Sequence, residues 1–432
     1  MTGEPAGAAR SARTRVLWAD HLGLARGKYV PARSTQTVTN HCLGVFSQQF
    51  DRRTSYAPGA GFEEGFPDLE ARFDSADIRP GWERATGVVV ADLFRNGSPL
   101  EISPRLALRR AIDAWSAAGY SVDVGIELEA FVLEADGAGG WRPWDTPGGF
   151  VYGTGALADP EGLFDEVMDV AETCGLGVES VTCESDVPQF EIALDHGDAL
   201  DAVDRAFLVR LMAREVAHRR GLLLTFMGRP FTDRPGSGMH VNVSLHDRDG
   251  NNALASASAD DGLSDLCKGV IAGLVAHHAG MTALCAPTVN AYKRLRPGML
   301  SGYWANWGYD HRVATTRIPP HRGPGTHVEH RLSDGAANPY LAVAAILHSG
   351  RLGVVDREPL PPPEAALEPD ESLGHCPADL AAALDALEGD EPLVSAVGAE
   401  LVANFTAVKR VEWQRFTEAV TDWELAQYLW FC

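Results

Sequence analysis

The sequence predicts an α+β protein with a small, strand-rich N-terminal domain and a larger domain of mixed strands and helices. Two observations support this prediction. Short segments alternate between apolar and polar residues, which is the period of a β-strand. Longer segments place apolar residues on one stripe, which is the period of an amphipathic helix. Strand-like segments dominate before Ser103 and helical segments follow it, so we place the domain boundary there, between residues 1–103 and 104–432.

In the N-terminal domain, Thr14–Ala19 and Gly87–Leu93 are the clearest predicted strands. Residues 54–65 lie between them and are rich in glycine and other turn-forming residues, which predicts a loop. The domain therefore contains short strands joined by irregular connections.

The segment Ser121–Phe131 is predicted as a strand with one apolar face, and it carries Glu127 and Glu129. The two glutamates are two residues apart and so project from the same face. Like charges side by side on a strand repel each other unless something compensates them. Divalent cations would compensate them, whereas the alternative is an ordinary surface strand with solvated glutamates.

Two later predicted strands also carry polar residues on one face. In Met239–Leu245 these residues are His240, Asn242 and Ser244, and in His327–Leu332 they are Glu329 and Arg331. Their presence beside apolar faces indicates a shared site rather than a core.

The segment Thr182–Leu194 adds Glu184 and Glu191, whose separation is odd. One straight strand would put these glutamates on opposite faces, but a turn or bulge near Pro188 would bring them to one site. The four segments together supply five carboxylates, one imidazole and one guanidinium, which indicates a site for metal ions and anions.

Helices are predicted by apolar stripes and by residues that favour helix starts. Ser264 and Asn338 are expected N-caps, and Pro104 and Pro339 suit a first turn. The predicted helices are Pro104–Ala117, Pro160–Cys174, Asp198–Arg220, Ser264–Leu284, a helix that starts at Pro339, Pro377–Ala386, Pro392–Ala403 and Val408–Tyr428.

The composition narrows the possible partners and location. A formal net charge of −22 disfavours nucleic acid and anionic membranes as partners. The 7 cysteines are scattered and form no CxxC pair, which is typical of a reduced, cytoplasmic protein. The sequence shows no N-terminal signal and no long apolar run, so we expect neither secretion nor a membrane span.

Five motifs then indicate a family. The motifs GIELEAF, ESDVPQFEI, GSGMHVNVSL, NAYKRLRPG and VEHRLSDGAANPYLAVAAIL occur in one order, and the chain resembles the glutamine synthetase superfamily over nearly its whole length. The N-terminal DHLGLARGK looks like the variant in members that glutamylate amines.

The resemblance implies a β-grasp N-terminal domain and a catalytic α/β domain with a curved antiparallel sheet. It also implies a homo-oligomer of stacked hexameric rings, with active sites between neighbouring subunits. Members use ATP to phosphorylate a carboxylate, usually the γ-carboxylate of glutamate, and an amine then displaces phosphate. Two or three Mg²⁺ or Mn²⁺ ions per site hold ATP and neutralise the transferred phosphoryl group.

The resemblance also implies roles for individual residues. The first metal site would consist of Glu129, Glu184 and Glu191, and the second of Glu127, His240 and Glu329. The implied roles of the others are acid binding for Arg294, Arg331 and Gly236, phosphate contact for Arg312 and Arg317, nucleotide binding for Ser244 and Asn242, and catalysis for Arg312 and Glu329.

The chain departs from the family pattern mainly around the amine. Leu300 stands where the family has a glutamate that helps deprotonate ammonium, and Pro235 replaces an asparagine that contacts substrate. Asn242 replaces the second histidine of an HxH pair, and His327 replaces an arginine. Asp51 is only a weak candidate for the aspartate that binds ammonium.

The metal and phosphate residues are thus intact while the ammonium residues are changed. We therefore predict an ATP-dependent carboxylate–amine ligase that makes a γ-glutamyl amide of an organic amine. The alternatives are an ammonium-dependent glutamine synthetase and a non-catalytic member that binds ligands or serves as a structural assembly. Tyr303, Trp304 and Trp307 follow Leu300, and they either line the amine entrance or pack beneath a loop.

Overall fold

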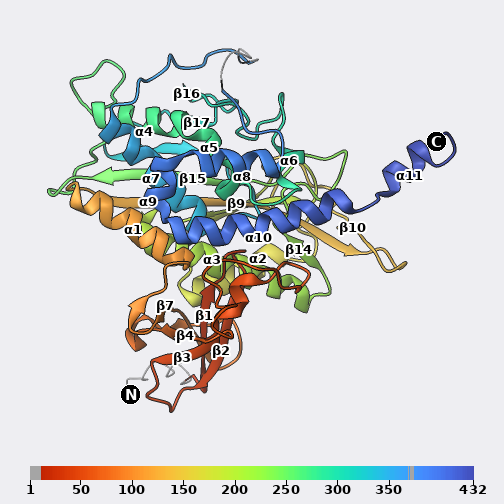
Figure 1. The fold of residues 1–432 in the computed structure, drawn as a ribbon. Helices are drawn as coiled ribbons and strands as arrows, with labels where there is room; N and C mark the ends of the chain where they lie inside the picture. Colours follow the sequence, from red (N-terminus) through yellow and green to blue (C-terminus); the bar gives the residue numbers. More distant parts are fainter. Residues whose placement is uncertain (1–10, 368, 370–373) are drawn as a thin grey trace, which may run out of the picture.

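The computed structural model describes residues 11–367, 369 and 374–432, and it confirms the α+β class (Figure 1). The N-terminal strands form a lobe below a larger body of sheet and helices, while the last helix, α11 (Asp422–Tyr428), projects away from that body. Residues 1–10 of the predicted N-terminal domain lie outside the described residues.

The N-terminal lobe contains two four-stranded sheets. The first has the order β2-β1-β6-β5, with β1 and β6 parallel, and the second has the order β3-β4-β7-β8. The strands are β1 (Arg13–Ala19), β2 (Ala25–Pro31), β3 (Val38–Cys42), β4 (Asp68–Arg72), β5 (Arg79–Pro80), β6 (Thr86–Val90), β7 (Asp92–Arg95) and β8 (Ser98–Pro99).

The predicted single strand Gly87–Leu93 is two strands, because the chain changes sheets within it. Strand β6 pairs with β1, whereas β7 pairs with β4 in the other sheet. The lobe has its own apolar cluster around Trp18, Leu43 and Phe46, to which Val408 is the one contributor from beyond Ile102 among the described residues. This separate core supports the boundary at Ser103, which we keep as a proposal.

The larger body is built on a ten-stranded, open sheet whose longest strand is β9 (Ser121–Ala135). The main path has the order β11-β12-β9-β15-β18-β17-β16, and β10, β13 and β14 also pair with β9. The other strands are β10 (Trp141–Pro143), β11 (Val178–Cys183), β12 (Gln189–Leu194), β13 (Gly197–Asp198), β14 (Leu223–Thr225), β15 (Met239–His246), β16 (Trp307–Tyr309), β17 (Thr316–Ile318) and β18 (Val328–His330).

Helices pack around this sheet, and the central helix α7 (Pro339–Asp356) is buried almost throughout its length, as expected for a helix that is apolar on all sides. The predicted caps Ser264 and Asn338 accept backbone hydrogen bonds as expected. The remaining helices are α1 (Pro104–Ala117), α2 (Leu163–Cys174), α3 (Ala199–Arg219), α4 (Asp265–Ala276), α5 (His278–Cys285), α6 (Ala291–Arg294), α8 (Leu380–Gly389), α9 (Glu391–Val397) and α10 (Ala399–Glu418).

Three of the predicted helices are divided differently. The predicted helix Ser264–Leu284 breaks at His277, whose Nδ1 lies 2.8 Å from Asp390 Oδ2. The predicted helices Pro392–Ala403 and Val408–Tyr428 are redistributed among α9, α10 and α11, because Gly398 has φ +120° and starts a new helix. Within the described part of the chain, no helix has both the length and the apolar character that crossing a membrane requires.

Candidate functional site

The register of the large sheet brings polar side chains of the four predicted segments side by side. We call Glu127, Glu129, Glu191, His240 and Glu329 the ligand row. Glu191 of β12 lies opposite Glu129 of β9, and His240 of β15 lies opposite Glu127. On the other side of β15, Glu329 of β18 lies opposite Asn242. Since side chains at alternate positions share a face, the strand pairing accounts for the convergence.

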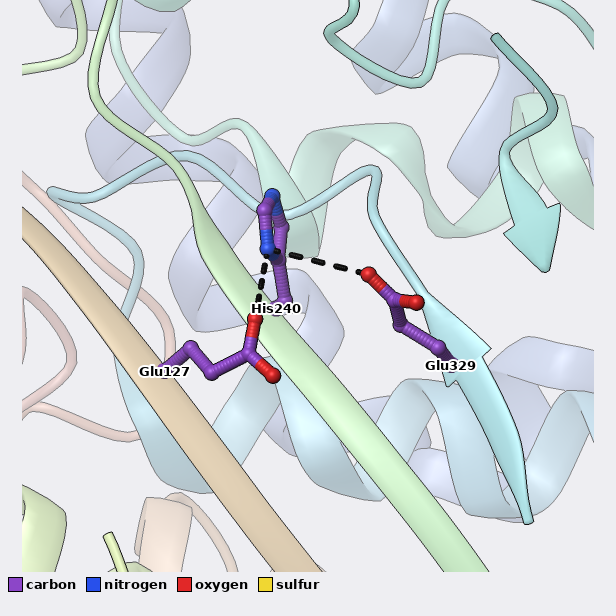
Figure 2. A group of neighbouring side chains, drawn as sticks. All are labelled: Glu127, His240 and Glu329. Carbon is purple, nitrogen blue, oxygen red and sulfur yellow. Dashed lines mark hydrogen bonds and ion pairs between the residues drawn. The ribbon is translucent and has the colours of Figure 1, made fainter. Parts of the chain in front are cut away.

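The first group of possible metal ligands consists of Glu127, His240 and Glu329, with ligand atoms within 4.8 Å of one another. His240 Nδ1 is 2.9 Å from Glu127 Oε2 and 3.9 Å from Glu329 Oε1 (Figure 2). His240 and Glu329 are buried, so their ligand atoms are shielded from bulk water. This group has the same composition as the second metal site that the sequence predicts.

The second group consists of Glu129, Glu191 and His240, also within 4.8 Å. His240 Nε2 lies 3.5 Å from Glu129 Oε1, so the imidazole stands between the two groups. The prediction differs here, because Glu184 belongs to neither group among the described residues. Its Oε2 instead accepts hydrogen bonds from the backbone N–H and hydroxyl of Ser185, at 2.8 and 3.0 Å, while the residue lines the same cleft.

The carboxylates of the row do not share one electrostatic environment. Burial raises the pKa of Glu191 to about 8, and the negative charges of Glu127, Glu184 and Glu129 add to the effect. Burial would also raise the pKa of Glu127, but hydrogen bonds from His240 and Asn242 outweigh it and lower that pKa to about 2. Crowded oxygen ligands, one of which resists ionisation without a cation, fit a site for Mg²⁺ or Mn²⁺.

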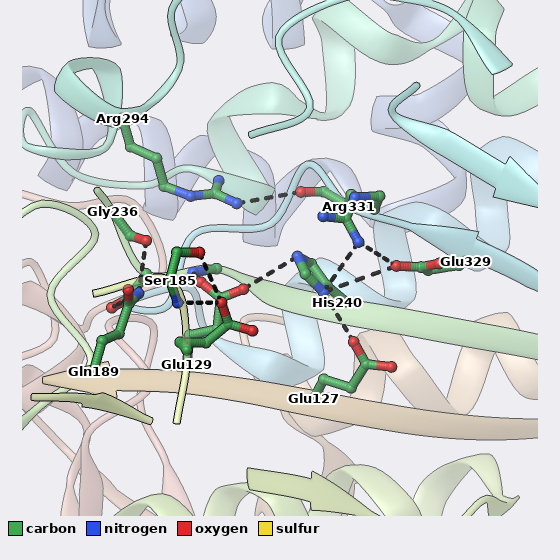
Figure 3. A network of polar contacts seen from close by, with 12 residues as sticks. Glu127, Glu129, Ser185, Gln189, Gly236, His240, Arg294, Glu329 and Arg331 are labelled. Carbon is green, nitrogen blue, oxygen red and sulfur yellow. Dashed lines mark hydrogen bonds and ion pairs between the residues drawn. The ribbon is translucent and has the colours of Figure 1, made fainter. Parts of the chain in front are cut away.

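Two buried arginines lie beside the row (Figure 3). Arg331 donates a hydrogen bond from Nη1 to Glu329 Oε1, and this Nη1 is 3.5 Å from His240 Nδ1. Arg294 donates to the carbonyl oxygens of Leu332 and Arg331, at 3.1 and 3.4 Å. The guanidinium groups of Arg294 and Arg331 are therefore held at the edge of the cleft, the first by backbone carbonyl oxygens and the second by Glu329.

Gly236 is required at its position by the close approach of Arg294. A Cβ atom there would lie 2.8 Å from Arg294 Cγ and 2.4 Å from the carbonyl oxygen of Gly228. The carbonyl oxygen of Gly236 accepts a hydrogen bond of 2.9 Å from Gln189 Nε2 (Figure 3). The backbone of Gly236 is thus held at the wall of the cleft.

These residues enclose a cleft of about 190 Å³. Its floor is polar, whereas its mouth includes the exposed side chains of Val151, Tyr152 and Leu300. The lining comprises Glu129, Val151, Tyr152, Glu184, Ser185, Gln189, Glu191, Pro235, Gly236, His240, Arg294, Met299, Leu300, Ser301, Arg312 and Arg331.

A second cavity of about 380 Å³ lies on the other side of the ligand row. Glu127 borders this cavity together with Asn242, Ser244 and His327, whereas Glu129, Glu191 and His240 border the first cleft. Asn242 Nδ2 donates to Glu127 Oε1 at 3.1 Å, so the substitution in the HxH pair leaves a contact to the row. The ligand row therefore separates two cavities that are lined by different residues.

Arg317 does not line either cavity among the described residues. Its Nη1 donates to Glu329 Oε2 at 2.6 Å, and its Nη2 donates to Asp310. Arg312 is exposed and lines the first cleft. Of the two predicted phosphate-contacting arginines, Arg312 therefore lines the first cleft, whereas Arg317 contacts the row through Glu329.

The aromatic residues after Leu300 pack inside the protein. Tyr303 stacks on His375 with ring centroids 5.1 Å apart, and Trp304 and Trp307 are buried. None of the three is among the described residues that line the cleft, so packing beneath a loop is the correct alternative. Asp51 does not line this cleft either, and its carboxylate forms an ion pair with Arg415.

Several residues in or beside the cleft were not predicted from the sequence, among them Val151, Tyr152 and Asp334. Val151 and Tyr152 come from a glycine-rich loop, in which Tyr152 has φ +61° and donates its N–H to the carbonyl oxygen of Cys183 at 2.9 Å. Buried Asp334 lies near Arg294, and burial raises the pKa of Asp334 to about 6. The glycine cluster around Tyr152 was an available signal, but no periodicity marks a residue in a loop or turn.

Comparisons with known proteins agree with this site. A family model described as the catalytic domain of glutamine synthetase matches residues 101–428. A gamma-glutamylethanolamide synthetase from Streptomyces coelicolor is 34% identical over 427 residues, which cover 94% of this chain and 90% of that protein. A glutamine synthetase from Clostridium saccharobutylicum is 34% identical over 383 residues, which cover 85% of each chain.

Solved structures with a similar fold also match nearly the whole chain. Ligand-free GmaS has a TM-score of 0.85 at 29% identity, and the match covers 98% of this chain and 97% of that one. A complex of GmaS with ADP also has a TM-score of 0.85, at 30% identity and the same coverage.

Proposed function

The chain belongs to the glutamine synthetase family, and from that premise we propose that it joins the γ-carboxylate of glutamate to an organic amine at the expense of ATP. Members of this family are ligases that form C–N bonds, use ATP and divalent metal ions, and take an acid and an amine. The identity of the acid and the amine is the part that we propose.

The observation that supports catalysis most strongly is the row of ligands between the two cavities. Glu127, His240 and Glu329 would hold one ion, and Glu129 and Glu191, joined by Glu184, would hold another. Bound ions would neutralise the phosphate oxygens of ATP and of the transferred phosphoryl group. A non-catalytic protein has no need of both groups, so their presence argues against the sensor or structural alternative.

The arginines suit the acid substrate. Arg294 and Arg331 are buried at the edge of the cleft, and a guanidinium can bind a carboxylate through two parallel hydrogen bonds. Gly236 lets Arg294 pack close against the backbone at that wall, because it has no side chain to displace the arginine. We therefore propose that these three residues orient the acid with its reacting carboxylate toward the ligand row.

The second cavity suits the nucleotide. Ser244 and Asn242 line this cavity, and Glu127 connects it to the metal ligands. Arg312, which lines the first cleft, and Arg317, which contacts Glu329, would stabilise the negative charge of phosphate, since an arginine is effectively always charged. ATP would then lie across the row from the acid, and the phosphoryl group would pass between the two cavities.

The mouth of the cleft favours an amine with an apolar substituent. Leu300 cannot bind ammonium or accept its proton, and its side chain is exposed beside Val151 and Tyr152. Apolar groups stabilise an apolar substituent by removing it from water. The similarity to a gamma-glutamylethanolamide synthetase supports the same choice over ammonium.

A panel of amines tests the proposal. Phosphate release from ATP should require both glutamate and an amine, and ethanolamine, methylamine or a longer alkylamine should give a higher kcat/KM than ammonium. Preference for ammonium over the whole panel would indicate the glutamine synthetase alternative. Absence of amine-dependent phosphate release with every acid tested would indicate the non-catalytic alternative.

We further propose that the chain forms stacked hexameric rings. Helix α11 projects from the body, and the residues of its segment include exposed Trp423, Leu425, Trp430 and Phe431 (Figure 1). Such a large exposed apolar surface is typical of an interface. Light scattering should give a mass near that of twelve chains for the full chain and a smaller mass after removal of residues 419–432. The cytoplasmic location stays a prediction.

A further inference from the structure

A third cavity of about 420 Å³ lies apart from the ligand row, between the β1–β2 turn, α3 and β14. Most of its wall is apolar, and α3 contributes two arginines to it, Arg210 and Arg214. The apolar side chains of the wall are Leu22, Leu24, Phe50, Phe207, Leu211, Leu223, Leu224, Phe226 and Met227.

Arg210 is half-buried and forms no ion pair with a described carboxylate, although the charge of Asp334 acts on it. Its guanidinium lies over the ring of Phe226, 5.2 Å from the centroid, and donates a hydrogen bond to the carbonyl oxygen of Ala337. Burial, together with the charge of Arg214, lowers the pKa of Arg210 to about 10. Within the part of the chain that the structure describes, the bond to Ala337 is the one hydrogen bond that Arg210 donates.

Arg214 lies one helical turn after Arg210, so the two side chains share a face of α3. Arg214 is exposed and forms neither a hydrogen bond nor an ion pair with any described residue. Like charges at this spacing repel each other and destabilise the helix. An anion between the two guanidinium groups would remove the repulsion and supply the missing hydrogen-bond acceptors.

Other arginines of the same helix are paired. Arg205 Nε lies 3.0 Å from Asp201, and Arg219 Nη2 lies 3.7 Å from Glu166. Glu412 is the one acidic residue among the described residues that line the cavity, and it is already engaged by Lys409 Nζ at 2.8 Å. In a chain with 59 acidic and 37 basic residues, an unpaired arginine pair facing a cavity is a specific feature.

We propose that this cavity binds a small monocarboxylic acid with an apolar body, such as a short unbranched fatty acid. The carboxylate lies between Arg210 and Arg214, and the apolar body packs against the Leu22–Leu24 turn and Phe50. The apolar wall favours such an acid over a free phosphate, whose whole surface is polar. This inference does not rest on the proposed function, because the cavity is separate from the ligand row.

The cavity also borders the segment that carries one cleft residue, Arg294. Asn290 lines the cavity and directly precedes α6, which carries Arg294. The side chain of Asn290 accepts a hydrogen bond from the Arg229 N–H at 2.8 Å and donates one to the Arg229 carbonyl at 3.0 Å. An occupant that shifts this segment changes the position of Arg294, so we expect the acid to alter KM for the ligase substrate.

Isothermal titration of the full-length protein with sodium hexanoate tests the site. Saturable binding with one site per chain is expected, and hexan-1-ol, which has no carboxylate, should not bind. Arg214→Gln and Arg210→Gln should each raise the Kd for hexanoate at least about tenfold, the loss expected for one charge-assisted hydrogen bond. Arg219→Gln is the matched control on α3 and should leave the Kd unchanged.

Lack of saturable hexanoate binding would overturn the proposal, as would an unchanged Kd in Arg214→Gln. Arg214 is exposed, so this variant keeps the test decisive even where Arg210→Gln unfolds. Arg294→Gln distinguishes the cavity from the substrate cleft. Hexanoate binding that survives Arg294→Gln supports the third cavity, whereas binding that Arg294→Gln abolishes assigns hexanoate to the cleft and overturns the proposal.

Discussion

Shortening Leu300 should weaken the use of alkylamines more than the use of ammonium. Leu300 is 56% exposed at the mouth of the cleft, which leaves about half of its surface for contact with a substituent of the amine. Ammonium has no such substituent and gains nothing from this contact. The comparison of the two amines therefore isolates the apolar contribution of Leu300.

The expected size follows from the burial of one leucine. Complete burial of a leucine side chain stabilises by about 1.5–3 kcal/mol, so burial of the exposed half contributes roughly 0.8–1.7 kcal/mol. Leu300→Ala should remove most of this contribution and lower kcat/KM for butylamine by about 4- to 15-fold. The loss should be smaller for methylamine, whose single carbon covers less surface.

The assay is amine-dependent phosphate release at saturating ATP and glutamate, with kcat/KM measured for ammonium, methylamine and butylamine. Leu300→Glu should raise the ratio of ammonium to butylamine use, because a carboxylate binds ammonium and accepts its proton. Val355→Ala, at an exposed position of α7 away from the cleft, is the control. Unchanged ratios in both Leu300 variants would refute the assignment of Leu300 to the amine.

Three further predictions concern the ligand row and its wall. Glu129→Ala and Glu329→Ala should each lower kcat at least about 100-fold, because each removes a ligand from a different metal group, and near-normal turnover at millimolar Mg²⁺ would contradict that grouping. Glu191 has a raised pKa of about 8, so between pH 4.5 and 8 the folded, metal-free protein holds a proton that the unfolded chain has lost. The stability of the metal-free protein should therefore fall as pH rises through that range. Its affinity for Mg²⁺, measured by calorimetry, should instead rise by up to about tenfold per pH unit until pH 8. The Glu191→Gln variant should lose this pH dependence of Mg²⁺ affinity. Gly236→Ala should raise KM for the acid roughly 10- to 100-fold, since the new methyl would lie 2.8 Å from Arg294 Cγ, and an unchanged KM would show that the acid binds elsewhere.

The sequence predicted the strands of the row well, because strand period and charge are local properties. The placement of Glu127 and Glu129 on one face of β9 follows from period two alone, and the structure confirms it. Which strands lie beside β9 is a matter of long-range pairing, which a single sequence does not encode as a pattern. From the sequence, the convergence of Glu191, His240 and Glu329 was therefore a hypothesis that rested on motif order. The register of the sheet explains how these three residues meet.

Loop positions were the least predictable part. Tyr152 reaches the cleft because its backbone is held by Cys183 and has a positive φ, and no repeat marks either property. The break of the predicted helix at His277 coincides with a contact to Asp390, more than a hundred residues away. Conversely, Trp304 and Trp307 are aromatic residues next to a site residue that turn out to belong to the interior.

We propose that the phosphoryl group passes from ATP in the second cavity to glutamate in the first cleft before the amine reacts. Glutamate labelled with ¹⁸O in its γ-carboxylate tests this order of steps. Attack of a carboxylate oxygen on the γ-phosphorus of ATP, followed by displacement by the amine, leaves that oxygen on the released phosphate. Mass spectrometry should find one ¹⁸O atom in phosphate for each amide formed, and phosphate without the label would contradict the account.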